Sequence, residues 1–87
     1  MTRYFLTYRG VSLPLQLTEE LQEADLRNRN TYFEAYYDAQ GRTTAINKLV
    51  YGELEMSHRY LWDEASGKLC QATIQIGDDE AQVLSLA

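Results

Sequence analysis

The sequence predicts a mainly β protein built as a single antiparallel meander sheet of five to seven strands, with at most one short helix near residues 19–26. Three observations lead to this fold class. Apolar and polar residues alternate with a period of two along most of the chain, as in a strand with one buried and one exposed face. Turn sequences at residues 38–41 and 64–67 separate runs rich in β-branched and aromatic residues. Only the segment from residue 18 to residue 30 departs from the pattern.

The first two strands are expected in "TRYFLTY" (residues 2–8) and "VSLPLQLT" (residues 11–18). In the second segment Val11, Leu13, Leu15 and Leu17 alternate with polar residues and Pro14, so one face is apolar. Proline has no backbone N–H to donate to a ladder. We therefore expect residues 11–18 to form an edge strand or the end of a strand.

The segment "TEELQEADLRNRN" predicts the short helix. Thr18 is a suitable N-cap, and Glu19 and Glu20 would fall in the first turn, where negative charge is favourable at the positive end of the helix dipole. Leu21 and Ala24 would then face the sheet. The helix is expected to have two turns at most.

Two hairpins are predicted in the middle of the chain. Asp38 is placed to accept hydrogen bonds from its own turn, and Gly41 to take the left-handed conformation that closes it. The second hairpin, in "SHRYLWDEASGKLCQATIQI", repeats this arrangement with Gly67. The tail "GDDEAQVLSLA" predicts an acidic turn and one last short strand. The whole chain, residues 1–87, is expected to form one domain.

Aromatic residues occur on both sides of the predicted sheet. Tyr32 and Tyr36 alternate with Phe33 and Tyr37, so both faces contain apolar side chains. One short helix is too small to cover two faces. The sheet is therefore expected either to curl into a half-barrel or to pack against a second copy, and we favour a homodimer because so short a chain builds only a small core.

Composition limits the classes of partner and compartment. The net charge of −5 argues against nucleic acid, which is bound by clustered Lys and Arg. Residues 1–50 hold six basic and six acidic side chains, whereas residues 51–87 hold two basic and seven acidic ones, a net of 2 − 7 = −5. Cys70 is the single cysteine, so no intrachain disulfide forms, and we expect a cytoplasmic protein. The N-terminal segment lacks a long apolar run, so no membrane association is expected.

The histidine in "YGELEMSHRYLWD" is the most conspicuous candidate site residue. Alternation puts His58 in one row with Leu54, Met56, Tyr60 and Trp62, and its neighbouring acids on the other side of the strand. Without a carboxylate or nucleophile nearby, a hydrogen-bonded histidine lining a core or pocket is the favoured interpretation over a general base or a metal ligand. No catalytic residue, metal ligand or cofactor is predicted.

A binding surface remains as the functional hypothesis for these side chains. Tyrosine and tryptophan are enriched in interfaces and ligand pockets, and the candidates for a ligand or partner surface are Tyr36, His58, Tyr60 and Trp62. Their alternative role is ordinary cross-strand packing in an antiparallel sheet. Arg27 and Arg29 form a possible anion contact, with a solvated loop as the alternative.

The segments "NRNTYFEAYYDAQGR" and "KLVYGELEMSHRY" resemble a family of small bacterial proteins catalogued as a domain of unknown function. The resemblance covers most of the chain and implies no activity. Separately, "YYDAQGRTTAI" is similar to the Tyr-Asp hairpin repeat of large bacterial shell-forming toxins, and from this local similarity we infer a hairpin alone.

Three functions are compatible with these features. The first is a non-catalytic cytosolic β domain, expected to be dimeric, that binds another protein or a small ligand through an aromatic sheet face. The second is a small acidic inhibitor or immunity-type protein whose C-terminal half occupies a basic site. The third is a ligand-binding protein or small enzyme with a pocket around His58.

Overall fold

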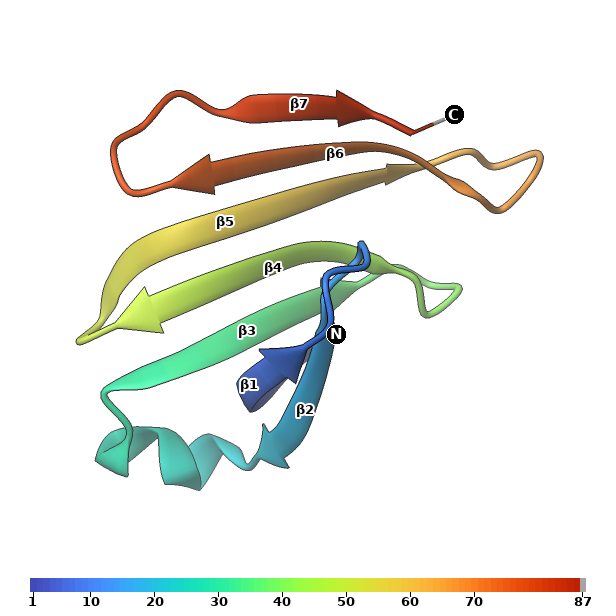
Figure 1. Ribbon diagram of the computed structural model, residues 1–87. Coiled ribbons are helices and arrows are strands. Elements are labelled where there is room, and N and C mark those ends of the chain that lie inside the picture. The colour runs from blue at the N-terminus through green and yellow to red at the C-terminus, as the bar shows by residue number, and fades with distance from the viewer. Residues whose placement is uncertain (87) are drawn as a thin grey trace.

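The computed structural model describes residues 1–86 and consists of one seven-stranded antiparallel sheet (Figure 1). The spatial order of the strands is β2-β1-β3-β4-β5-β6-β7. Their bounds are β1 Thr2–Arg9, β2 Gln16–Leu21, β3 Thr31–Tyr37, β4 Thr43–Val50, β5 Glu53–Trp62, β6 Leu69–Ile76 and β7 Gln82–Ser85. The predicted mainly β meander is confirmed. The sheet is twisted but open, with β2 and β7 at opposite edges, so it does not close into a barrel.

The segment 11–18 differs from the prediction. Residues 10–15 form a loop, and strand β2 begins only at Gln16. Leu13 and Leu15 do not alternate in a ladder; they pack against the hydrophobic core as part of this covering loop. The apolar spacing that predicted a strand therefore reflects two leucines pointing toward the same core from an irregular segment, and Pro14 between them supplies no N–H for a ladder.

The helix also starts later than predicted. Thr18, Glu19 and Glu20 belong to β2, and the helical segment is a short 3₁₀ helix, η1, at Glu23–Asn28. Gln22, not Thr18, occupies the N-cap, and its backbone N–H donates to the Asp25 carboxylate at 2.9 Å. The ladder with β1, in which Thr18 pairs with Thr7 and Glu20 with Phe5, satisfies backbone groups that a helix from Thr18 would have used.

The hairpin turns follow the predicted chemistry. The Asp38 carboxylate accepts hydrogen bonds from the backbone N–H groups of Gln40 and Arg42, and Gly41 has a φ of +81°. Between β4 and β5 the two turn residues Tyr51 and Gly52 have φ values of 51° and 78°, as in a type I′ hairpin turn. Local sequence therefore fixes where the meander reverses.

The hydrophobic core lies on one side of the sheet, which we call the apolar face. Cross-strand partners point to the same side, and the register places Ala35, Ile46, His58 and Ile74 next to one another across β3 to β6. Ala35 and Ile46 are fully buried. In Figure 1 the loop of residues 10–15 crosses in front of β4 on this side. That loop and the curled β1–β2 pair cover the core instead of a helix.

The opposite side, which we call the tyrosine face, is more polar than the sequence suggested. It carries Tyr4, Tyr32 and Tyr36, with the rings of Tyr4 and Tyr32 in edge contact at 6.0 Å. Between the tyrosines runs a chain of hydrogen bonds in which Arg59 donates to Asn47 and Asn47 donates to Glu34. This face therefore needs no second layer to satisfy its side chains, whereas the apolar face does.

Candidate functional site

The four aromatic and histidine candidates do not form one surface. Tyr36 pairs with Ala45 and lies on the tyrosine face, whereas His58 pairs with Ile46 and lies on the apolar face. Tyr60 shares the apolar face because it pairs with the buried Ala72. Alternation along β5 predicted which of its residues share a face of the sheet. It carries no information on which residues of β3, two strands away, lie on that same face.

His58 and Tyr60 form a buried hydrogen-bonded pair. His58 is 4% exposed and Tyr60 is 6% exposed. The Tyr60 hydroxyl lies 2.6 Å from Nδ1 of His58, and the backbone N–H of Leu15 donates to the same hydroxyl oxygen at 3.3 Å. The arrangement that satisfies all three groups has the Tyr60 O–H donating to Nδ1, which leaves the imidazole proton on Nε2. One hydroxyl thus ties the covering loop to the sheet.

This pair is in a poor electrostatic position for acid–base chemistry. Burial lowers the pKa of His58, and burial also raises the pKa of Tyr60, so both side chains are neutral near pH 7. Within residues 1–86 the hydrogen-bond partner of the His58 ring is Tyr60, not a carboxylate or a serine hydroxyl. The same residues contain no group of three or more His, Cys, Asp and Glu side chains arranged to hold a metal ion. The geometry supports a structural role for His58.

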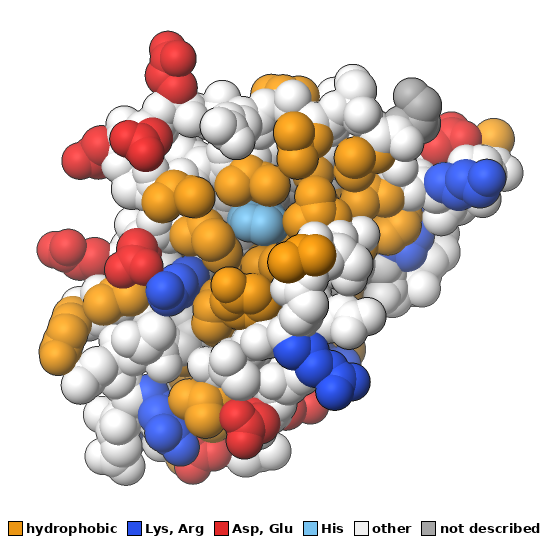
Figure 2. Space-filling view, in the orientation of Figure 1, with side chains coloured by type: hydrophobic (Ala, Val, Ile, Leu, Met, Phe, Trp, Pro, Cys, Tyr) orange, Lys and Arg blue, Asp and Glu red, His pale blue; other side chains and the backbone are white. Residues whose placement is uncertain are grey.

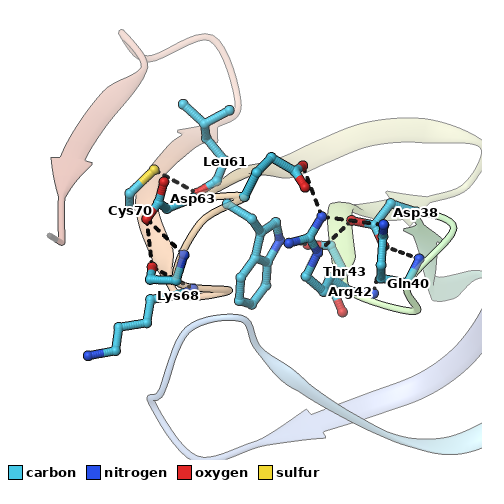
Figure 3. Close-up of polar contacts among 11 residues, drawn as sticks. Asp38, Gln40, Arg42, Thr43, Leu61, Asp63, Lys68 and Cys70 are labelled. Carbon is cyan, nitrogen blue, oxygen red and sulfur yellow. Dashed lines mark hydrogen bonds and ion pairs between the residues drawn. The ribbon is translucent and has the colours of Figure 1, made fainter.

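Trp62 connects the two hairpin turns at one end of the sheet, and Figure 3 shows Arg42 next to Asp38 in the first of these turns. Its indole N–H donates to the backbone carbonyl of Thr43 at 2.8 Å, and the Arg42 guanidinium lies over its ring at 5.9 Å. Arg42 in turn contacts Asp38 in its own turn and Glu64 in the next one, at 2.8 and 3.1 Å. Hydrogen bonding to Asp38 raises the pKa of Arg42. Trp62 is therefore half-buried and holds the two turns together through its indole N–H and its contact with Arg42.

The apolar face continues beyond the part that the loop covers. Met56 and Ile74 are half-buried, Ile76 is 56% exposed and Leu84 is 37% exposed. Ile76 pairs with Met56, Ile74 with His58 and Leu84 with Ala72, so all four point to the same side. We call these four residues the β6 patch. Figure 2 shows hydrophobic side chains surrounding the histidine on this side of the molecule.

Acidic residues border the β6 patch. A depression of about 60 Å³ is lined by Ile74 and Ile76 on one side and by Asp79, Glu80 and Gln82 on the other. In Figure 2 the acidic side chains project at the periphery of the hydrophobic area. An apolar floor with a negative rim suits a partner that presents an apolar side chain flanked by basic ones. The sequence signal for this patch was the alternation of Ala72, Ile74 and Ile76 in β6.

A second concave region lies at the β3–β4 hairpin. It has a volume of about 480 Å³ and is lined by Met1, Arg3, Tyr37, Asp38, Ala39 and Gly41. The Arg3 guanidinium forms a two-bond ion pair with Glu20 and lies 5.8 Å from the centre of the Tyr37 ring. The charge of Arg3 is therefore paired with Glu20 within the fold.

The predicted anion contact is placed at the end of η1. Arg27 lies in the last turn of the helix and Arg29 directly after it, and both are exposed. Neither side chain makes a hydrogen bond or an ion pair with another residue in the described part of the chain, residues 1–86. Both side chains are therefore exposed to solvent, Arg27 on the last turn of η1 and Arg29 directly after it.

Fold and site together define a small all-β domain with an open antiparallel sheet, a single apolar face and a hydrogen-bonded histidine inside it. The chain belongs to the family described as "Family of unknown function (DUF6156)", whose model matches residues 1–87. The predicted membership in an uncharacterised family is confirmed. Comparison with curated proteins and comparison with solved structures found no match. Within residues 1–86 no helix is long and apolar enough to cross a membrane.

Proposed function

We propose that this protein is a non-catalytic binding domain that engages a protein partner through the β6 patch. The observation that carries the proposal is the exposure of Ile76 and Leu84 on the same side as the core. Side chains of this size exposed together, next to a buried cluster, are typical of interaction sites. Catalysis at His58 is not proposed, because the ring is buried and held by Tyr60.

The partner is inferred from the chemistry of the patch and its surroundings. Asp79 and Glu80 line the same depression as Ile74 and Ile76, so a complementary surface carries an apolar side chain next to lysine or arginine. Residues 51–87 contain seven acidic and two basic side chains, so the preference for a basic partner is not confined to the depression. The lone cysteine is consistent with a cytoplasmic setting for such an interaction.

A titration with a designed peptide tests this proposal. We expect a synthetic peptide alternating Leu and Lys to shift ¹⁵N amide resonances of β6 and of the 77–80 turn, and Ile76→Asp to abolish those shifts. Leu61→Asp is the matched control, because Leu61 is 57% exposed but pairs with Gln71 on the tyrosine face. Shifts that survive Ile76→Asp, or that disappear equally in Leu61→Asp, would refute the patch as the binding surface.

The acidic inhibitor is the second candidate, favoured by the clustering of negative charge in residues 51–87. It differs from the first in what it predicts for the same experiment. If charge alone drives binding, a peptide of Lys and Ser will shift the same resonances as the Leu and Lys peptide, and added salt will remove both sets of shifts. If the apolar floor is essential, only the Leu-containing peptide will bind.

We also propose that the chain forms a homodimer. The support is the small size of its core, in which Ile46 is the single large side chain that is fully buried within residues 1–86. A chain this short buries only about 60% of its unfolded surface, so association would add useful burial. Light scattering that gives one chain's mass of 10.1 kDa at all protein concentrations would exclude the dimer.

A further inference from the structure

The two edges of the sheet are protected to different degrees. The outer strand β2 carries Glu19 and Glu20, and Glu19 has a φ of 61°, which interrupts the regular strand. At the other edge, all four residues of β7 are exposed, and the segment "AQVLSL" at 81–86 has neither charge nor proline. Natural sheets normally block an edge with charge, proline or a bulge. Strand β7 has none of these three devices, and its one protection is its short length of four residues.

The hydrogen-bonding groups that β7 turns outward follow from its pairing with β6. The backbone N–H of Leu86 donates to the carbonyl of Cys70 at 2.8 Å, which fixes the phase of the ladder. Hydrogen-bonded pairs alternate along an antiparallel ladder, so Leu84 and Gln82 bond inward to Ala72 and Ile74. The N–H and C=O groups of Val83 and Ser85 therefore point away from β6. They face the free edge of the sheet, because β7 is the outermost strand (Figure 1).

We propose that β7 pairs antiparallel with β7 of a second copy about a two-fold axis at Leu84. In this register Val83 of one copy exchanges both backbone hydrogen bonds with Ser85 of the other, and the symmetric pair does the same. Leu84 faces its own symmetry mate in a non-hydrogen-bonded pair, where the Cα atoms approach to about 4.5 Å. The inference rests on the homodimer proposed above and specifies how that dimer forms.

Charge favours this arrangement and this occupant. The acidic turn of residues 78–80 directly precedes β7, so a parallel alignment of two copies would bring two sets of three carboxylates together. The antiparallel alignment moves the two turns to opposite ends of the joint. The paired segment itself is uncharged, so two copies with a net charge of −5 each meet where neither carries charge. The outward groups of Val83 and Ser85 are self-complementary, as an isologous interface requires.

The first test removes an outward donor without disturbing the sheet within one copy. In Ser85→Pro the lost N–H is one that β6 does not use, and edge strands tolerate proline. We expect light scattering to give about twice the 10.1 kDa chain mass for the wild type and for Ser85→Ala, and the single-chain mass for Ser85→Pro. Circular dichroism checks that Ser85→Pro keeps its β spectrum.

The second test reads the register directly and does not depend on the proline variant. In a Cys70→Ser background, Leu84→Cys places two thiols opposite each other across the two-fold axis, and mild oxidation is expected to give a covalent dimer. Val83→Cys is the matched control. It moves the thiol by one residue, to the tyrosine face and opposite Ser85, so little covalent dimer is expected.

The outcomes distinguish three proposals: pairing through the β7 edge, formation of a homodimer by any surface, and partner binding at the β6 patch. A monomeric wild type overturns both the homodimer and its geometry. If the wild type is dimeric but Ser85→Pro has the same mass, or if Val83→Cys and Leu84→Cys cross-link equally, then pairing through β7 is overturned and the homodimer is not. Ile76→Asp is expected to leave the dimer mass unchanged, and Ser85→Pro is expected to leave peptide binding at the β6 patch unchanged.

Discussion

Replacing Tyr60 by phenylalanine tests the central hydrogen-bonded pair. The substitution removes one oxygen atom and keeps the ring that packs in the core. It leaves Nδ1 of His58 without its donor and the Leu15 N–H without its acceptor. A buried polar group left unpaired costs about 1–3 kcal/mol. His58 is buried and Leu15 half-buried, so we expect the free energy of unfolding to fall by about 2 kcal/mol in total.

Urea denaturation measures this loss. With m-values of about 1–3 kcal/mol/M for small proteins, a loss near 2 kcal/mol lowers the urea midpoint by roughly 0.7–2 M. Hydrogen exchange of the Leu15 amide should accelerate as well, because the covering loop is no longer tied to the sheet. Tyr37→Phe is the matched control. It removes the Tyr37 hydroxyl, which is half-buried with its ring and makes no hydrogen bond within residues 1–86.

A change below about 0.5 kcal/mol in Tyr60→Phe, together with unchanged exchange of the Leu15 amide, would refute the bridging role of the hydroxyl, since surface substitutions alone produce effects of that size. An equal loss in Tyr37→Phe would attribute the effect to the ring environment instead. Faster Leu15 exchange without a change in global stability would restrict the role of the bond to the loop. In that case the sheet would not depend on the contact.

Three further predictions concern stability. Burial lowers the pKa of His58 below its value in the unfolded chain, so below about pH 6.5 the unfolded chain binds more protons than the folded one. The free energy of unfolding should therefore decrease as the pH falls through this range, by at most about 1.4 kcal/mol per pH unit. Urea unfolding of the wild type and of His58→Phe at several pH values should show a smaller decrease in the variant. Trp62→Ala should cost about 3 kcal/mol through lost packing and the lost hydrogen bond to Thr43, and an unchanged denaturant midpoint would contradict those two contacts. Tyr51→Asn should increase the free energy of unfolding by up to about 1 kcal/mol and so raise the melting temperature, because Tyr51 is 76% exposed and has a φ of 51°, which asparagine adopts more readily. A lower melting temperature would show that contacts of the tyrosine ring stabilise the fold more than the improved turn does.

The hairpins illustrate what local sequence determines well. Asp38 and Gly41 specify a turn through contacts within five residues, so the predicted turn chemistry agrees with the structure. Period-two alternation likewise placed His58 in a row with Met56 and Tyr60. The same alternation misled at Leu13 and Leu15, because two leucines in a covering loop have the spacing of a strand. The predicted helix cap at Thr18 failed because pairing with β1 took those residues into a ladder.

By itself the sequence determined the class of fold, the turns at residues 38–41 and 64–67 and the side-chain order along β5, since all three depend on steric and hydrogen-bonding preferences of neighbouring residues. Only the tertiary structure decided which strands share a face, that Tyr36 is separated from His58, and that the apolar face is covered at β4 and open at β6. Those features depend on register and on contacts between distant residues. The bond from Leu15 to Tyr60 joins positions 45 residues apart, and no local pattern in the chain encodes it.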